Sequence, residues 1–480
     1  MPTSRKCSVV SLDAAECLPR NTRRPLRLVL RSIPHISAKP FTYLLASVLF
    51  LLSGVVPVFA DTDYWVPWVT NLTTTSATIN WRGANGGSGE VQYATASYYD
   101  EHHGFQHTVT SETTGAYQHA ALTDLEPNTS YVYWARPSDN ADQFSNRTFK
   151  TMPVSGPFTF LVISDSHAQE KRFKYVADAI AKYETDALFI LDGGDYTSWD
   201  YEEYWSFYFQ YGDGMLAKFP LFHAIGNHEY HNYEDKDGGP THADQYHWTF
   251  DVAKDGALNY SFDCADIRFV VLNSPDPHNA NDENPTLAHT ESQVPWLKQQ
   301  LDNDKLGTFT IHHHPIYNYD WSGIDAKLGP WETLYHTFNI SANFVGHIHS
   351  YQRFSVEGIP YFTVGNGGGI FINMDQNATV AKWYQYGATR QLGYLKITVD
   401  PENNIASAQE IFVAYVETDD SETATVYNPP IIADTVTFPL SRKHPSPAVP
   451  ALNTVGVLAF CGLLLAAGII LMRRRPMRQC

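Results

Sequence analysis

Five short clusters of Asp, Asn and His, each placed directly after an apolar stretch, constrain the fold of this chain more than any other feature. The clusters are Asp165-Ser166-His167, Asp192-Gly193-Gly194-Asp195, Gly226-Asn227-His228-Glu229, His312-His313-His314-Pro315 and Gly346-His347-Ile348-His349. Apolar runs of this length are typical of buried strands, and the carboxyl ends of strands in α/β sheets border the ligand-binding crevice. The pattern predicts an α/β domain whose site is assembled from five distant loops.

The apolar runs themselves predict the secondary structure between the clusters. The spacing of apolar residues predicts a helix over Phe173–Tyr183, which makes a β-α-β unit of the strands on either side of it. The predicted strands are Phe158–Ser164, Ala187–Leu191, Phe219–Ile225, Thr308–Ile311 and Ala342–Val345.

The polar clusters carry the side chains of a metal site. A carboxylate can bridge two cations with its two oxygens, and histidines two residues apart on a strand end share a face. We assign the bridging role to Asp195, with Asp192 as the rival candidate that we interpret as a turn or supporting residue. Oxygen and nitrogen donors without cysteine suit two Fe, Mn or Zn ions. The candidate ligands are Asp165, His167, Asp195, Asn227, His313, His347 and His349.

Residues 61–153 show a different pattern, with short alternating runs separated by Gly, Asn and Pro. Such spacing predicts an antiparallel β-sandwich. The stretch LTDLEPNTSYVYWA resembles the fibronectin type III pattern, and no cluster of acids, bases or metal ligands occurs in this part of the sequence. We interpret the domain as a rigid spacer rather than as a module that binds substrate or a partner. The predicted strands are Ser76–Trp81, Glu90–Ala94, Tyr117–Leu122, Tyr131–Ala135 and Arg147–Thr151.

Both ends of the chain have the composition of targeting segments. Residues 1–60 combine basic residues with an apolar run at 41–60 and small residues before Asp61, which predicts a signal sequence cut near that point, with an uncleaved anchor as the alternative. A linker at 441–454 leads to an apolar run at 455–472 and an arginine cluster, so that 455–480 is expected to be a transmembrane anchor or a sorting signal. Export to the periplasm, the cell surface or the medium is therefore expected.

The charge of the central region limits its partners. Residues 61–440 hold 19 of the 33 Lys and Arg residues and 49 of the 51 Asp and Glu residues, for a net charge of −30. A body this acidic repels the phosphate backbone of nucleic acids, so we expect no nucleic-acid partner. A small anionic substrate needs local positive charge, which bound metal ions supply.

Together, the five clusters resemble those of the calcineurin-like metallophosphoesterases, and the whole arrangement is similar to the purple acid phosphatase-like branch with its fibronectin-like N-terminal domain. The resemblance implies a four-layer β-sandwich flanked by helices over residues 154–440. It also implies that Asp195 is shared by two metal ions. The first ion is expected at Asp165, Asp195 and His349, and the second at Asp195, Asn227, His313 and His347.

Two departures from that branch bear on the site. Ser198 stands where purple acid phosphatases have a tyrosine ligand, and His167 is expected to replace it, so no purple colour is expected. Tyr196, one register away, is interpreted as a packed aromatic. The histidine pair that plant enzymes carry beyond the His-Pro motif is missing, and His231 or His314 is the candidate to compensate.

The predicted function is an exported hydrolase that cleaves phosphate monoesters through a dinuclear metal centre and a metal-bound hydroxide. His228 is the expected proton or hydrogen-bond donor to the leaving oxygen, with Asn227 and His314 also expected to contact the substrate. Loop 365–369 is interpreted either as part of the pocket or as a plain turn, and Tyr351 and Arg353 either as phosphate contacts or as packing and surface charge. The alternatives are a phosphodiesterase or nucleotide hydrolase at the same site, and a non-catalytic surface binding protein.

Overall fold

A computed structural model describes residues 64–440, except 85–86, 231–242, 252–257, 280–283, 320–322, 373, 375–378 and 419–420. The described residues all belong to one compact unit. None of the helices within these ranges is long and apolar enough to span a membrane. The expected signal sequence and the expected C-terminal anchor or sorting signal both lie outside the described residues.

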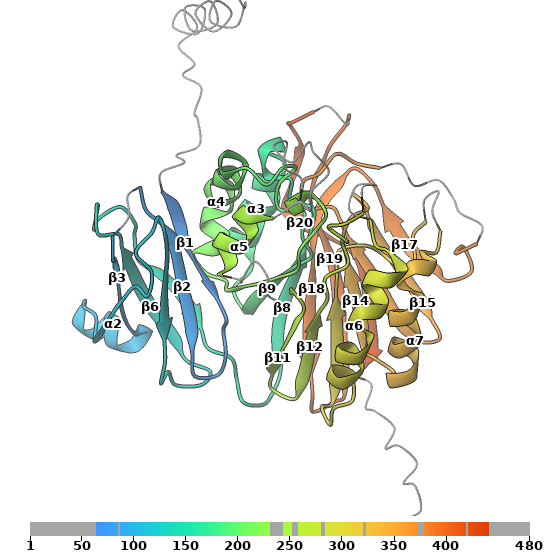
Figure 1. Cartoon of the computed structure of the whole chain (residues 1–480), viewed down its shortest axis with the longest axis horizontal. Coiled ribbons are helices and arrows are strands. Elements are labelled where there is room, and N and C mark those ends of the chain that lie inside the picture. The colour runs from blue at the N-terminus through green and yellow to red at the C-terminus, as the bar shows by residue number, and fades with distance from the viewer. Residues whose placement is uncertain are drawn as a thin grey trace, which may run out of the picture. The chain divides into compact units, whose positions relative to one another are not determined.

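The first part of the described chain is an antiparallel sandwich of two sheets, which Figure 1 shows in blue and teal. One sheet has the order β1-β2-β5 and the other the order β4-β3-β6-β7, with the short helix α2 (Ala96–His102) after β3. The strands are β1 (Trp65–Thr70), β2 (Ala77–Arg82), β3 (Glu90–Thr95), β4 (His107–Thr110), β5 (Tyr117–Leu122), β6 (Ser130–Arg136) and β7 (Arg147–Lys150). Buried residues such as Trp81 and Tyr133 fill the space between the sheets. The predicted all-β domain is confirmed.

The sandwich packs closely on helix α4 (Glu202–Leu216) of the following domain. The ring of Phe209 stacks on Trp65 with 4.7 Å between centroids and lies 4.4 Å from Trp68. The indole of Trp65 also donates a hydrogen bond to Ser206, and Arg82 pairs with Glu202 at 2.6 Å. These buried aromatic contacts couple the sandwich to a helix that begins seven residues after the candidate ligand Asp195. A domain that served only as a rigid spacer would not need contacts so close to the candidate site.

We expect Phe209→Leu to lower the free energy of unfolding by about 1–2 kcal/mol, because leucine stays apolar but loses both aromatic contacts. Calorimetry should show one cooperative transition at a lower temperature. Phe207→Leu is the matched control, since Phe207 is only partly buried on the same helix, and its cost should be about 0.5 kcal/mol or less. Separate transitions for the two domains in the wild-type protein would contradict this coupling.

The second part of the chain contains two larger mixed sheets. The six-stranded sheet has the order β10-β9-β8-β18-β19-β20, and the seven-stranded sheet the order β11-β12-β13-β14-β16-β15-β17. The first sheet is built from β8 (Phe158–Ile163), β9 (Ala187–Asp192), β10 (Leu221–His223), β18 (Gln391–Asp400), β19 (Ile405–Tyr415) and β20 (Thr425–Pro439). The second is built from β11 (Tyr260–Cys264), β12 (Ile267–Val271), β13 (Gly307–Ile311), β14 (Ala342–Val345), β15 (Tyr351–Val356), β16 (Ile359–Val364) and β17 (Tyr384–Ala388).

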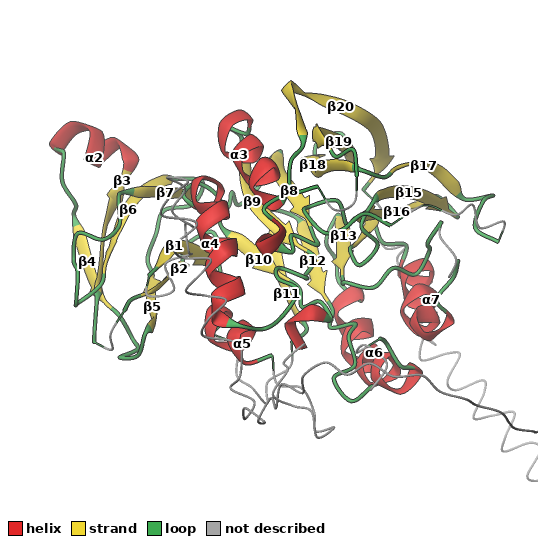
Figure 2. Ribbon diagram, turned by 90° about the horizontal axis from the view of Figure 1, so that it is seen from above, coloured by secondary structure: helices red, strands yellow, loops and turns green. Residues whose placement is uncertain are grey.

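Helices cover the outer faces of this pair of sheets, as Figure 2 shows. Helix α3 (Phe173–Tyr183) and α4 share an apolar cluster with the six-stranded sheet, whereas α6 (Leu287–Leu301) and α7 (Gly329–Phe338) share one with the seven-stranded sheet. Between the sheets, the ring centroid of Phe160 of β8 lies 5.1 Å from that of Phe269 and 5.6 Å from that of Phe309 on the opposite sheet. The predicted four-layer fold is confirmed. The remaining helices are α5 (Asp244–Phe250) and the 3₁₀ turns η1 (Ala168–Glu170), η2 (His228–Tyr230) and η3 (Ala326–Leu328).

The sequence predictions for the motif-bearing elements match the structure closely. The helix Phe173–Tyr183 and the strand Ala342–Val345 have the predicted bounds. The third predicted strand is too long, because β10 covers only Leu221–His223. Pro220 has no N–H to give to a ladder, so the strand cannot begin as early as Phe219.

Candidate metal centre

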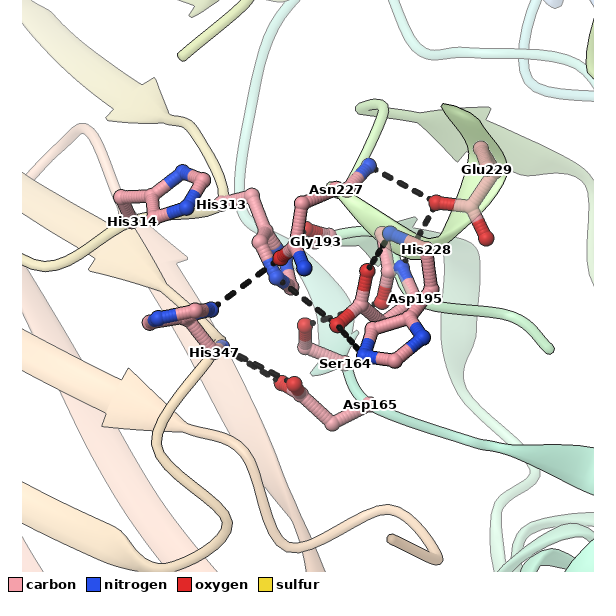
Figure 3. A network of polar contacts seen from close by, with 12 residues as sticks. Ser164, Asp165, Gly193, Asp195, Asn227, His228, Glu229, His313, His314 and His347 are labelled. Atoms are coloured by element: carbon pink, nitrogen blue, oxygen red, sulfur yellow. Dashed lines mark hydrogen bonds and ion pairs between the residues drawn. The ribbon is translucent and has the colours of Figure 1, made fainter. Parts of the chain in front are cut away.

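All five polar clusters lie at the carboxyl ends of parallel strands. Strands β8, β9 and β10 run parallel in one sheet, and β13 and β14 run parallel in the other. The two sheets face each other, so five loops that are distant in sequence meet at one edge, and Figure 3 shows their side chains converging. The sequence analysis predicted this meeting point because each cluster directly follows a predicted strand.

The convergent side chains form two groups that could each hold a metal ion. Asp165, His167, Asp195 and His349 form one, and Asp195, His313 and His347 form the other. Within each group the ligand atoms lie within 4.8 Å of one another, and Asp195 belongs to both. Asn227, the seventh predicted ligand, points its side-chain oxygen at Nδ1 of His347, 3.1 Å away.

Unusual backbone conformations bring these residues inward. Asp165, His167, Asp195 and His347 all have a positive φ, between 37° and 68°. This conformation is costly for residues other than glycine and persists where the surrounding structure enforces it. Four such residues in one cluster are typical of a functional site.

Two glycines allow the loops to approach the carboxylates. A Cβ atom on Gly346 would collide with Ser164 Oγ and Asp165 Oδ2, and one on Gly226 would collide with Asp195 Oδ1. Glycine is required at both positions because the neighbouring backbone passes directly against a ligand carboxylate.

Hydrogen bonds to carbonyl oxygens fix which ring nitrogen of each histidine carries the proton. Nδ1 of His313 donates to the carbonyl of Gly193 at 2.9 Å, Nδ1 of His349 to that of Ile370, and Nδ1 of His228 to that of Ser198 at 2.9 Å. A carbonyl only accepts, so the proton of each neutral ring sits on Nδ1. The lone pair of each Nε2 is therefore left to face the cluster, as in histidines that bind metals.

The Nε2 atoms of His313 and His349 each face a carboxylate oxygen. Nε2 of His313 lies 3.0 Å from Asp195 Oδ2 and makes no hydrogen bond, and Nε2 of His349 lies 3.4 Å from Asp165 Oδ1. Nε2 of His167 and Nε2 of His349 are 3.1 Å apart. An unprotonated imidazole nitrogen and a carboxylate oxygen repel at these distances unless a proton or a metal cation lies between them.

The electrostatics of the cluster also call for cations. Asp165 and Asp195 are buried, and their ion pairs within the described residues involve histidines alone. Burial lowers the pKa of His313, but the carboxylate of Asp195 overcomes this effect and raises it to about 10. Two buried carboxylates without a Lys or Arg partner are stable when metal ions neutralise them. The donor set of oxygen and imidazole nitrogen fits Zn, Fe or Mn.

His228 and His314 occupy different positions at this centre. The side chain of His228 is 27% exposed and its Nε2 lies 4.0 Å from Asp195 Oδ2, so it borders the site from the solvent side. His314 is buried, its ring lies 4.3 Å from that of His347, and its Nδ1 is 3.0 Å from Ser274 Oγ. A role of either histidine in substrate binding stays a prediction, and His231 lies outside the described residues.

Contacts in the core account for several other residues of the motifs. Tyr196 is a packed aromatic, as predicted: it is fully buried, stacks on Trp205 and donates its hydroxyl hydrogen to the carbonyl of Ala224. Tyr351 and Arg353 both bind Asp434 of strand β20, which favours their structural interpretation. Asp192 accepts hydrogen bonds from the backbone of Gly194 and from Tyr208, as expected of a supporting residue.

The sequence reasoning assigned no role to Glu229, although it lies in the third cluster. Its carboxylate is fully buried and accepts hydrogen bonds from the backbone N–H groups of Asp195, Tyr196 and Gly226 at 2.8–2.9 Å. Figure 3 shows Glu229 to one side of Asp195, with dashed lines to its carboxyl group. The sequence does show an acidic residue directly after Asn227-His228. Only the fold shows from which backbone N–H groups this residue accepts hydrogen bonds.

Ser198 is hydrogen-bonded to His167, the candidate ligand that is predicted to replace the tyrosine of purple acid phosphatases. Its hydroxyl lies 2.7 Å from Nδ1 of His167. The serine at the position of the tyrosine is therefore hydrogen-bonded to the histidine that is expected to replace that tyrosine as a ligand.

We expect Ser198→Ala to weaken metal binding by about 10- to 100-fold, as is typical when a partner of a metal-ligating histidine is removed. Competition with a chelator measures the change. Ser198→Thr keeps the hydroxyl and should retain nearly all of the affinity. Equal affinities for the alanine variant and the wild type would show that this hydrogen bond does not orient His167.

Comparison with known proteins defines the class. Residues 158–351 match the calcineurin-like phosphoesterase family, and residues 65–151 match the purple acid phosphatase N-terminal domain. The chain therefore contains a calcineurin-like phosphoesterase domain, preceded by a purple acid phosphatase N-terminal domain. This is the domain pair of the purple acid phosphatase-like branch, as the sequence motifs predicted.

Curated relatives and solved structures agree with this assignment. Purple acid phosphatase 21 of Arabidopsis thaliana is 26% identical over 272 residues, which cover 53% of this chain and 59% of the relative. Probable purple acid phosphatase 20 of the same plant is 23% identical over 64% of this chain and 71% of its own length. A purple acid phosphatase from yellow lupin seeds shares the fold with a TM-score of 0.56, at 14% identity over 78% of this chain and 74% of its own. PhoD does so with a TM-score of 0.61, at 14% identity over 88% of this chain and all of its own.

Proposed function

We propose that this protein is an exported, metal-dependent hydrolase that cleaves phosphate monoesters at a dinuclear centre. One observation carries the proposal: Asp195 belongs to both ligand groups, and the lone pairs of the surrounding imidazoles point at it and at Asp165. Asp165, His167, Asp195 and His349 would hold one ion, and Asp195, Asn227, His313 and His347 the other. The kinship with purple acid phosphatases supports the reaction class.

The residues around the centre have separate tasks in this proposal. Bound metal ions would supply the positive charge that stabilises the phosphoryl oxygens. They would also lower the pKa of water, so that hydroxide is available to attack phosphorus. His228 stands at the exposed side of the centre, where it can donate a proton or a hydrogen bond to the leaving oxygen. The carbonyl of Ser198 orients its ring by accepting the hydrogen of Nδ1.

A paired assay separates the proposed monoesterase from a phosphodiesterase. The purified protein is assayed with p-nitrophenyl phosphate and bis-p-nitrophenyl phosphate, before and after treatment with a chelator, and its metal content is measured by elemental analysis. We expect turnover of the monoester that is lost with the metal and restored by Zn, Mn or Fe. Turnover of the diester alone would overturn the monoester assignment. Two bound ions without turnover of either ester would favour a binding protein.

The optical spectrum of the iron-loaded protein provides an independent readout. Ser198 stands at the position of the tyrosine ligand, and the Tyr196 hydroxyl is bonded to a carbonyl in the core. The iron-loaded protein should therefore lack the visible absorption of an iron-tyrosinate centre. A purple product would place a tyrosine on the metal and contradict the role proposed for His167.

Export is the part of the proposal that rests on the chain ends. The apolar stretches at 41–60 and 455–472, each beside basic residues, favour passage through a membrane and attachment or sorting at the C-terminus. Mass spectrometry of the protein from its own cells, with fractionation, tests this. A mature N-terminus near Asp61 in an extracytoplasmic fraction is expected, and an intact chain in the cytoplasm would refute it.

A further inference from the structure

Glu410 of strand β19 is a fully buried acid with half of its hydrogen-bonding capacity unused. Its Oε1 accepts a hydrogen bond from Nδ2 of Asn366 at 2.8 Å. Among the described residues its Oε2 has no hydrogen-bond partner, and neither has the side-chain oxygen of Asn366, which is also fully buried. Two unpartnered acceptors, one on each member of a bonded pair, indicate that one of the two oxygens carries a hydrogen that the other accepts.

The strands around Glu410 are shaped to receive this pair. The pairing register shifts between Leu392 and Gly393 in β18, and again between Glu410 and Ile411 where β19 meets β20. Such bulges redirect side chains. Gly393 donates its N–H to the carbonyl of Asn366, and a Cβ on Gly393 would come within 2.7 Å of Glu410 Oε1 and 2.8 Å of Asn366 Nδ2.

Within the described residues, no Lys or Arg forms an ion pair with the buried acid. The titratable groups whose charges act on Glu410, or on which its charge acts, are Asp434 of β20 and the hydroxyls of Tyr351, Tyr386 and Tyr394 from β15, β17 and β18. Arg353, whose charge acts on Tyr351, pairs with Asp434. Burial raises the pKa of Glu410 well above its ordinary value, and the charge of Asp434 raises it further. The hydrogen bond from Asn366 lowers this pKa, but by less than burial raises it. A proton on Oε2 would supply the donor that Asn366 lacks.

Asn366 lies in the glycine-rich loop 365–369, which contacts the backbone of two of the ligand clusters. Gly367 donates its N–H to the carbonyl of Ser164, and Gly369 donates to that of Asp165 at 2.9 Å. Gly365 donates to Ser350, and the carbonyl of Ile370, directly after the loop, accepts the hydrogen of His349 Nδ1. Asn366 has the only side chain in this five-residue stretch, so its partner fixes the loop.

We propose that Glu410 is a protonated positioning residue: with Asn366 it forms the two-hydrogen-bond ring of a carboxylic acid and a primary amide, which holds loop 365–369 against Asp165 and His349. Oε1 accepts from the amide N–H, and the acid O–H donates to the amide oxygen, so all four polar atoms are satisfied. The consequence for metal binding rests on the proposed function, whereas the acid–amide ring does not.

The pH dependence of stability tests the ring itself. Glu410→Gln is a neutral mimic that can still donate to and accept from Asn366. A carboxyl whose pKa is raised on folding contributes stability that is complete below its unfolded value of 4.5 and is lost as the pH rises through the folded value. The wild type should therefore lose stability relative to Glu410→Gln as the pH rises above 4.5. A pH-independent difference between the two would overturn protonation of Glu410.

Infrared spectroscopy gives a direct signature of the same proton. The wild-type protein at neutral pH should show the carbonyl stretch of a buried, protonated carboxylic acid that Glu410→Gln lacks. If the wild-type spectrum minus the Glu410→Gln spectrum shows no such band, Glu410 is a carboxylate and the proposal is overturned.

Metal retention tests the positioning role. Glu410→Leu removes both hydrogen bonds at similar size and should bind Zn or Mn about 10- to 100-fold more weakly in chelator competition, whereas Glu410→Gln should bind as the wild type does. Equal binding by all three proteins would refute positioning. A wild type that binds no metal would instead refute the dinuclear centre and leave the pH and infrared results to judge the ring.

Discussion

Replacing Asp195 with asparagine should abolish hydrolysis and metal retention together. Asp195 is the one carboxylate that both ligand groups share, so the substitution removes charge from two sites at once. Metal ions contribute several kcal/mol to phosphoryl transfer, and we expect kcat/KM to fall by about 10³-fold or more. Elemental analysis of the same preparation should show less than half of the wild-type metal content, which separates this loss from a defect in chemistry alone.

Asp192→Asn is the matched control for this substitution. Asp192 lies three residues earlier, is equally buried and belongs to neither ligand group. Burial raises its pKa well above the ordinary value, whereas the histidines around Asp195 overcome burial and hold the pKa of that carboxyl well below it. A neutral amide therefore resembles the native state of Asp192 and not that of Asp195. Comparable losses in the two variants would show that buried charge in general, not metal bridging, explains the effect.

Substitutions at Glu229 should damage both stability and metal binding in a graded series. Its two oxygens accept three backbone hydrogen bonds, two at Oε2 and one at Oε1. Glu229→Gln can keep the pair at one oxygen, while Glu229→Ala leaves three buried N–H groups without an acceptor. A buried donor left without a partner costs about 1–3 kcal/mol. We expect the alanine variant to lose about 3–5 kcal/mol of unfolding free energy, and the glutamine variant about half as much.

The effect on the metals follows from where those N–H groups lie. Two of them belong to Asp195 and Tyr196, so the carboxylate of Glu229 fixes the backbone that carries the shared ligand. We expect metal affinity to fall by about 100-fold in Glu229→Ala. Glu184→Gln is the control. Glu184 is also buried, but it accepts its hydrogen bonds from the side chains of Tyr394 and Lys396, which belong to none of the ligand clusters. It should reduce stability without changing metal affinity, and parallel losses of metal in both variants would contradict the positioning role of Glu229.

The protein matches the sequence predictions most closely where the sequence pattern is periodic and local. Helix Phe173–Tyr183 and strand Ala342–Val345 follow from the spacing of apolar residues, since a buried face repeats with the period of its own element. Long, partly exposed strands such as β20 at the sheet edge show no such period, and none of the elements after Val364 was given bounds. Their positions depend on pairing with strands far away in the sequence.

The sequence by itself determined which chemistry the site can perform, because residue types at strand ends fix the available donors: oxygen and imidazole nitrogen, without a thiolate. It also determined where the donors meet, because parallel strands bring their carboxyl ends to one edge. Only the tertiary structure decided how the donors are held. Glu229, Ser198 and the Glu410–Asn366 pair make hydrogen bonds to residues up to 44 positions away in the sequence. Such contacts depend on distances after folding, which no spacing along the chain encodes.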